Sequence, residues 1–263
     1  MFKKIIATGI AVGILSSSLF ASGGNKPDEL IHLYHPVQVI MPNLKKLKIS
    51  KDQEERLNKD MLSVYPPKIQ AHMKEIAKME KEVQEAIYEK YMTKNQLKEK
   101  IDKVQKLKRE VTDIHIDALN TLSDILNKKQ FAQSLKMMEK QNLGNKKSNK
   151  FKIDELAILP HPGKLLKTAK IEATQEQKVR ISKEVKAIFA PVFQDKMRKA
   201  FDLEKKLQRA VKKGKNKIEL KKLLDEIAKL KREAMDGRID ALNHIQKIFT
   251  KEQWEKVNKL TYK

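Results

Sequence analysis

KLKREVTDIHIDALN, residues 106–120, returns 123 positions later as KLKREAMDGRIDALN, residues 229–243. The two stretches are identical at 11 of 15 positions. Apolar residues recur in both at spacings of three and four, which predicts an amphipathic helix. A bias toward Lys and Glu would produce similar helices, but it would not produce identical residues in register. We therefore expect an internal duplication to organise this chain.

The duplication extends toward the N-terminus. Residues 49–87 align with residues 173–211 at an offset of 124, which places Pro67 on Pro191. Between the copies, residues 141–152 are polar and contain Gly, Asn and Ser, as is typical of a linker. The expected segments are a signal peptide, a short extension, a first repeat, a linker and a second repeat, at residues 1–21, 22–34, 35–140, 141–160 and 161–263.

Four short phrases share one spacing: ISKDQ, LNKKQ, ATQEQ and FTKEQ. In each, a Ser, Thr or Asn precedes a Gln by three residues. This is the spacing of a capping box, in which the first side chain accepts a hydrogen bond from the backbone N–H three residues on and the Gln bonds back to the cap's own N–H. The phrases therefore predict helix starts, with the capping pairs Ser50 and Gln53, Asn127 and Gln130, Thr174 and Gln177, and Thr250 and Gln253.

These starts predict four helices in each repeat. In the first repeat they cover residues 50–64, 68–91, 94–126 and 127–141, and Pro66 and Pro67 are expected to separate the first from the second. The third helix is long and needs a partner helix to cover its apolar seam. The seam has near-heptad spacing and consists of Leu97, Ile101, Val104, Val111, Ala118, Leu122 and Ile125. The blocks around Ile116 and Leu119, and around Ile239 and Leu242, are expected to lie in the core.

The N-terminus and the composition predict export. MFKK followed by IIATGIAVGIL has the basic start and the apolar run of a secretory signal peptide, with cleavage expected after Ala21. An uncleaved membrane anchor is the alternative, although the run is only about half as long as a bilayer span. The chain has no Cys, so it forms no disulfide, and 57 Lys and Arg against 34 Asp and Glu give a net charge of +23. No later stretch is apolar enough to span a membrane, which predicts a soluble mature protein.

Two capping phrases per unit of about a hundred residues, around a helical hairpin with one long helix in a basic, Cys-free, exported chain, resemble the LTxxQ-motif Spy/CpxP family of periplasmic proteins. The resemblance covers both repeats, but only the Gln is kept in all four phrases. It implies a hairpin that pairs antiparallel into a thin curved cradle and binds unfolded proteins without ATP. Since this chain carries two units, we expect them to pack as an intramolecular pseudo-dimer, with a homodimer as the alternative. A sensor kinase of an envelope stress system is a further possible partner by resemblance.

A cradle for unfolded clients needs basic residues for attraction and flexible Met side chains for adaptable packing. Candidate client-binding residues are Lys108, His115, Lys231, Arg238, Met73 and Met197. The four cations stand where strict heptad spacing would place apolar residues. They either face a client at an open seam, or form a solvated face if the apolar stripe drifts onto Leu107, Ile114 and Leu230.

Metal binding is the alternative function, because some members of the resembled group bind or sense zinc, copper or nickel. The candidate ligands for a divalent transition metal are His32, His35 and His161. Zinc sites need three or four ligands, and the other histidines are scattered over separate helices, so no metal is favoured. His35-Pro36 and His161-Pro162 can equally be extended entries to the repeats.

Other classes have less support. None of the short catalytic motifs for nucleophiles, metals or phosphates occurs, so we expect a protein that is not an enzyme and has no cofactor. Nucleic acid is disfavoured as a partner by export and by the lack of aromatics among the basic helices. Anionic lipid is harder to dismiss, because basic amphipathic helices bind it, but a packed seam leaves little apolar face for lipid.

Overall fold

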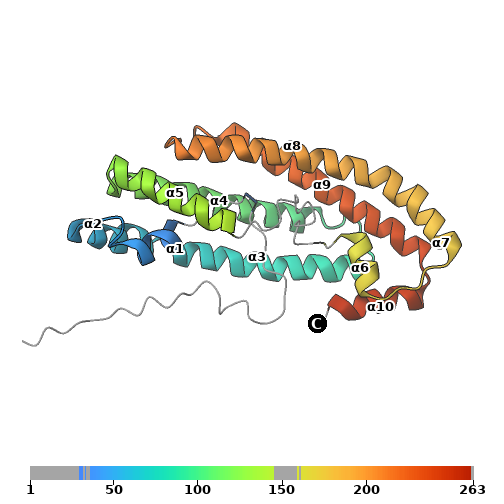
Figure 1. Ribbon diagram of the computed structural model, residues 1–263. Helices are drawn as coiled ribbons and strands as arrows, with labels where there is room; N and C mark the ends of the chain where they lie inside the picture. The colour runs from blue at the N-terminus through green and yellow to red at the C-terminus, as the bar shows by residue number, and fades with distance from the viewer. Residues whose placement is uncertain (1–29, 32, 34–35, 145–158, 160, 262–263) are drawn as a thin grey trace, which may run out of the picture.

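The structure, a computed structural model, describes residues 30–31, 33, 36–144, 159 and 161–261 (Figure 1). Every regular element in these ranges is a helix, which confirms the all-α class. None of these helices has the length and apolar content that a membrane crossing requires. The expected signal peptide, residues 1–21, and the centre of the expected linker lie outside the described residues.

The helices of the first half, residues 36–144, begin with a short one that was not predicted. They are α1 (Pro36–Ile40), a 3-10 turn (Met41–Asn43), α2 (Lys51–Arg56), a π-helical segment (Leu57–Leu62), α3 (Tyr65–Tyr88), α4 (Lys98–Ile125) and α5 (Lys128–Gly144). The four predicted helices correspond to α2 with the π segment, α3, α4 and α5.

The second half, residues 161–261, has the same order. Its elements are α6 (Pro162–Thr168), α7 (Gln175–Arg180), a π-helical segment (Ile181–Lys186), α8 (Ala187–Lys212), α9 (Lys221–Ile248) and α10 (Lys251–Thr261). The π-helical segments lie at equivalent positions, so even this uncommon geometry occurs in both halves.

The prolines do not break the chain as predicted. Pro66 and Pro67 lie in the first turn of α3, where the missing N–H has no helical partner to lose. The predicted break between the first two helices does occur, but at the turn of residues 63–64, so the prolines begin α3 instead of forming the break themselves. Pro191, the equivalent of Pro67, lies inside α8, because that helix begins before it.

The long helices α4 and α9 form the centre of the molecule. Figure 1 shows α3, α4, α9 and α8 lying side by side in this order, and contacts join each neighbouring pair. The predicted seam of α4 is confirmed, since its residues are all at most 4 % exposed. Ile116, Leu119, Ile239 and Leu242 are also buried. The seam is covered from two sides, by α3 and by α9.

Neither half has a core of its own. One apolar cluster joins α3 and the first part of α4 to the second part of α9 and α10. The other joins α1, the second part of α4 and α5 to the end of α8 and the first part of α9. Each cluster thus combines residues of both halves, as expected if two units of this size share their apolar burial.

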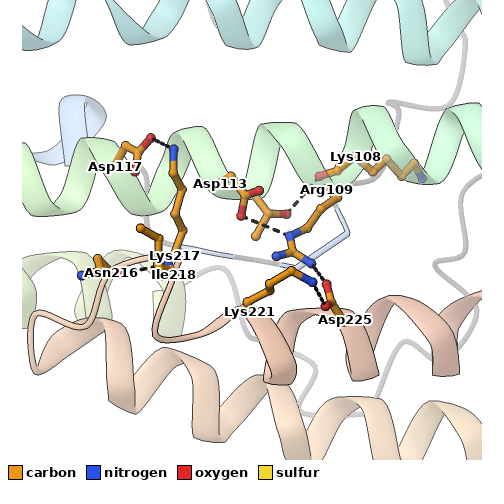
Figure 2. Close-up of polar contacts among 10 residues, drawn as sticks. Lys108, Arg109, Asp113, Asp117, Asn216, Lys217, Ile218, Lys221 and Asp225 are labelled. Carbon is orange, nitrogen blue, oxygen red and sulfur yellow. Dashed lines mark hydrogen bonds and ion pairs between the residues drawn. The ribbon is translucent and has the colours of Figure 1, made fainter.

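Within the described ranges, four ion pairs between the halves form two reciprocal sets, and a fifth, Lys212 with Glu139, has no such mate. Arg109 binds Asp225 with 2.6 Å between Nη1 and Oδ1 (Figure 2), and their equivalents Arg232 and Asp102 bind in the same way. Lys217 likewise binds Asp117, and the equivalent residues Lys94 and Asp240 form the second pair of that set. In each set, the basic residue of the first half binds the acidic residue of the second half, and the equivalent basic residue of the second half binds the equivalent acidic residue of the first.

The two arginines also bond to a carboxylate four residues later on their own helices. Arg109 donates to Asp113 at 3.1 Å, and Arg232 donates to Asp236 at 2.9 Å. Lys221 and, more weakly, Arg109 lower the pKa of Asp225. Lys98 and then Arg232 lower the pKa of Asp102 in the same manner. Such half-exposed pairs each contribute little to stability, so they mainly show how the two halves are aligned with each other.

Candidate functional site

All four predicted capping pairs are formed. Ser50 and Thr174 each accept a hydrogen bond from the N–H of the Gln three residues later, and that Gln accepts one from the cap's N–H. Asn127 with Gln130 and Thr250 with Gln253 make the same two bonds. The phrases are therefore helix starts, as predicted.

The structure also explains why only the Gln is kept in all four phrases. Within the first half, the side chains of Gln53 and Gln130 bond to each other in both directions, at 2.8 and 3.1 Å. Gln177 and Gln253 do so in the second half, at 2.8 and 3.2 Å. Each amide also donates to a backbone carbonyl near the other's helix, such as Gln177 to Ile248 at 3.1 Å.

The pair Gln53–Gln130 joins the start of α2 to the start of α5. The pair Gln177–Gln253 joins the start of α7 to the start of α10. A carboxylate could accept from the cap N–H, but it could not donate to the carbonyl and to the partner amide. The sequence contained one usable signal for this contact, the invariance of Gln where a capping box also tolerates Glu.

Gln177→Glu is expected to lower the free energy of unfolding by about 2 kcal/mol, because it keeps the cap but leaves the Ile248 carbonyl facing an anion without a donor. Chemical denaturation at neutral pH measures this. Gln175→Glu, the same change in the same exposed helical turn, is the control and should alter stability by less than about 0.5 kcal/mol. Equal stability of the Gln177 variant and the wild type would show that capping alone accounts for the motif.

The four cations proposed to contact clients are buried. Lys108, His115, Lys231 and Arg238 are 5 %, 2 %, 8 % and 4 % exposed. The prediction that they lie at an open seam is wrong, and so is the alternative of a solvated face. Leu107 and Leu230 are buried beside them, because α4 and α9 are covered over a wider arc than one heptad stripe.

Two of these lysines form buried ion pairs at equivalent places. Lys108 Nζ lies 2.6 Å from Glu80 on α3, and Lys231 Nζ lies 2.6 Å from Glu204 on α8. The side chains of both pairs are at most 10 % exposed. A buried charge needs such a partner, so these pairs join the two helices of each hairpin.

Lys231 and Arg238 bind the chain's own backbone. Lys231 donates to the carbonyl of Leu30, and Arg238 Nη1 donates to the carbonyl of Leu159 at 2.8 Å. The Arg238 guanidinium also stacks on the ring of Phe193, 4.2 Å from its centre. We call the surface of α4 and α9 around Lys231 and Arg238 the central face.

Four apolar side chains from outside the helices lie on the central face. Leu30, Ile31 and Leu33, from the expected N-terminal extension, are at most 3 % exposed and belong to the second apolar cluster. Leu159, from the expected linker, is fully buried in the first cluster. Sequence reasoning missed these residues, since nothing in a short apolar stretch shows what it packs against.

The two candidate methionines differ in exposure. Met73 on α3 is half-buried and packs against the first cluster, whereas Met197 on α8 is 8 % exposed and part of that cluster. Met197 is therefore a core residue in this structure and not a surface residue, and Met73 keeps part of its side chain at the surface.

Of the three metal candidates, His161 lies within the described residues. His32 and His35 lie outside them. His161 is the N-cap of α6, with an extended backbone, and its Nδ1 accepts a hydrogen bond from the N–H of Gly163 at 3.1 Å. In the ranges that the structure covers, no three His, Asp or Glu side chains form a group suited to a metal ion. His161 thus has a structural role at the entry to the second half.

Comparison with known proteins found no matching family model, no matching curated protein and no matching solved structure.

Proposed function

We propose that this protein is a periplasmic, ATP-independent chaperone, with no catalytic activity, that binds extended apolar segments of unfolded or misfolded proteins on its central face. One observation carries the proposal: the face already holds apolar chain segments that belong to no helix. Leu30, Ile31, Leu33 and Leu159 are buried there, and the two neighbouring carbonyls are bound by Lys231 and Arg238.

The chemistry of this contact suits clients of many sequences. Lys231 and Arg238 bond to backbone carbonyls, which every polypeptide offers, so the bonds select an exposed backbone and not a side chain. The surrounding apolar clusters supply the free energy, which burial of apolar surface provides without strict geometry. The net charge of +23 speeds encounter with clients that carry acidic residues.

The reciprocal ion pairs support an intramolecular pseudo-dimer. A contact between two copies related by a two-fold axis repeats each residue pair in both directions. Arg109 with Asp225 and Arg232 with Asp102 have this relation. We therefore propose that one chain, and not two, forms the cradle. When no client is bound, the chain covers the central face with its own segments.

The test is suppression of aggregation without ATP. A denatured model enzyme is diluted with an equimolar amount of this protein, and light scattering is followed at low and high salt. Suppression by the wild type is expected. The variant with Leu30, Ile31 and Leu33 replaced by Ser should bind clients about tenfold more tightly, because a competing occupant of the face is weakened.

Ile218→Ser is the matched control for the triple variant, since Ile218 is 80 % exposed and the change should leave binding unaltered. Circular dichroism establishes that each variant keeps its helices. The proposal fails if neither the wild type nor the folded triple variant suppresses aggregation. Equal suppression by both would show that clients bind elsewhere than on the central face.

A further inference from the structure

The outer segments of the two halves carry different charge. Residues 51–94, which contain α2 and α3, have 9 basic and 9 acidic side chains. The equivalent residues 175–217, which contain α7 and α8, have 14 basic and 5 acidic side chains. The net charge is therefore zero in the first half and +9 in the second, although the helices correspond one to one.

Five acidic residues of the first half are replaced by cations in the second. At the offset of 124, Glu54, Glu75, Glu82, Glu85 and Glu89 correspond to Lys178, Lys199, Lys206, Arg209 and Lys213. All five cations are exposed. The exchange thus alters the surface of α7 and α8 and leaves the packed side as it is.

The cations of α8 share one side of the helix with exposed aliphatic residues. Lys199 and Lys206 lie seven residues apart, which keeps them on one face, and Lys213, seven residues further, is the residue at which the helix ends. Ile188 and Val192 lie on the same face about three and two turns before Lys199, and they are 56 % and 51 % exposed. The buried residues Ala200 and Leu207 each follow one of these lysines by one position, about 100° around the helix, so the buried side adjoins the basic one.

Aliphatic exposure has also increased relative to the first half. At the offset of 124, Val192 corresponds to Lys68 and Val179 to Glu55. At the offset of 123 that applies to the later helices, Ile218 corresponds to Asn95. These three aliphatic side chains are 51 %, 41 % and 80 % exposed. The second half therefore gained both cations and exposed aliphatic groups where the first half has polar residues.

Within the described residues, three of the four cations of α8 and its C-terminal end lack a carboxylate neighbour, and the fourth, Lys199, is paired. In the first half, Glu75 binds Lys103 at 2.8 Å and Glu82 binds Lys100 at 2.6 Å. In the part of the chain that the structure describes, Lys206, Arg209 and Lys213 have no carboxylate partner, while Lys199 is bound to Asp195 on its own helix. Unpaired exposed cations are free to meet an anionic partner.

We propose that this surface of α8, which we call the basic face and define by Ile188, Val192, Lys199, Lys206, Arg209 and Lys213, docks on an anionic lipid bilayer. A helix lying in the headgroup layer needs cations for the lipid phosphates and apolar side chains for the acyl boundary, and this face supplies both. A nucleic acid or acidic protein would use the cations but gain nothing from Ile188 and Val192. The first half, with its neutral outer segment, then faces away from the lipid, and the central face stays separate from it.

The test uses the protein purified after export and vesicles of phosphatidylcholine with or without phosphatidylglycerol. Co-sedimentation with the anionic vesicles is expected, and it should weaken steeply with salt. Replacing Lys199, Lys206 and Lys213 by Glu gives them the residues of the equivalent first-half positions. This variant should lose binding on the order of a hundredfold.

The control variant carries Glu at Lys68, Lys74 and Lys78, which makes the same change in net charge on exposed positions of α3. It should keep nearly full binding. If both variants lose binding equally, net charge alone is responsible and the basic face is rejected.

A second variant, with Ile188 and Val192 replaced by Ser, separates lipid from other polyanions. Binding to anionic vesicles should fall by about tenfold or more, while retention on heparin should not change. Unchanged vesicle binding of this variant would overturn the lipid proposal in favour of a soluble polyanion. Aggregation suppression without vesicles should be the same in all these variants, so failure of this proposal does not bear on the central face.

Discussion

Replacing Lys108 by Met is expected to lower the free energy of unfolding by about 3–5 kcal/mol. The substitution leaves the carboxylate of Glu80 in the interior, where its side chain is 6 % exposed, without the ammonium that lies 2.6 Å away. The size of Met nearly matches that of Lys, so the loss reports on charge and not on a cavity. Equilibrium denaturation measures it.

Adding Glu80→Leu to Lys108→Met is expected to restore most of the lost stability. The pair is then replaced by apolar side chains, and removing both charges of a buried pair is often neutral or stabilising. Lys100→Met is the matched control on the same helix. It breaks the exposed pair with Glu82, whose side chains are 48 % and 38 % exposed, and should cost less than about 1 kcal/mol. If Lys108→Met costs no more than this control, the ion pair has no special importance in the interior.

Trp254→Ala is expected to cost about 3–5 kcal/mol, because it removes a large buried side chain and leaves a cavity. Trp254 is 1 % exposed and its Nε1 donates to the carbonyl of Tyr88 at 2.9 Å. The Tyr88 ring packs next to it, 6.3 Å between ring centres, and burial raises the pKa of the Tyr88 hydroxyl above its ordinary value. The contact joins α10 of the second half to α3 of the first.

Phe131→Ala is the control for Trp254→Ala, since Phe131 is the equivalent residue of the first half but is only half-buried. Its loss of stability should be clearly smaller. Trp254 is the one Trp of the chain, so the fluorescence of the wild type reports the docking of α10 directly. A Trp254 signal that changes well before the helical signal during denaturation would show that the two halves separate first and do not share one core.

The capping phrases and the apolar periodicity of the sequence predicted most of the helices correctly. The capping pairs begin helices where the phrases place them, because a capping box needs only residues within one turn. The seam of α4 is buried as its periodicity indicates, since one helix face follows directly from residue spacing. The exceptions are α1 and α6, which are short, and Pro66, which begins a helix because a first turn does not need its N–H.

Candidate binding residues were harder to predict for a physical reason. Lys108 and Lys231 break the heptad pattern, and a cation at such a position is either exposed or paired inside. The carboxylates that decide this, Glu80 and Glu204, lie 28 and 27 residues away on another helix. Periodicity within one helix has no information about them. In the same way, the segments that cover the central face could not be inferred from their own residues.

Duplication, helix starts, the all-α class and the buried faces of the long helices follow from the sequence, because each depends on residues within one or two turns or on direct comparison of the two copies. Three features depended on packing between distant segments: the exchange of core between the halves, the mutual bonds of the glutamine pairs, and the burial of Lys231 and Arg238 beneath Leu30 and Leu159. Each requires contacts between residues more than 70 positions apart, and such contacts form only when the helices are assembled.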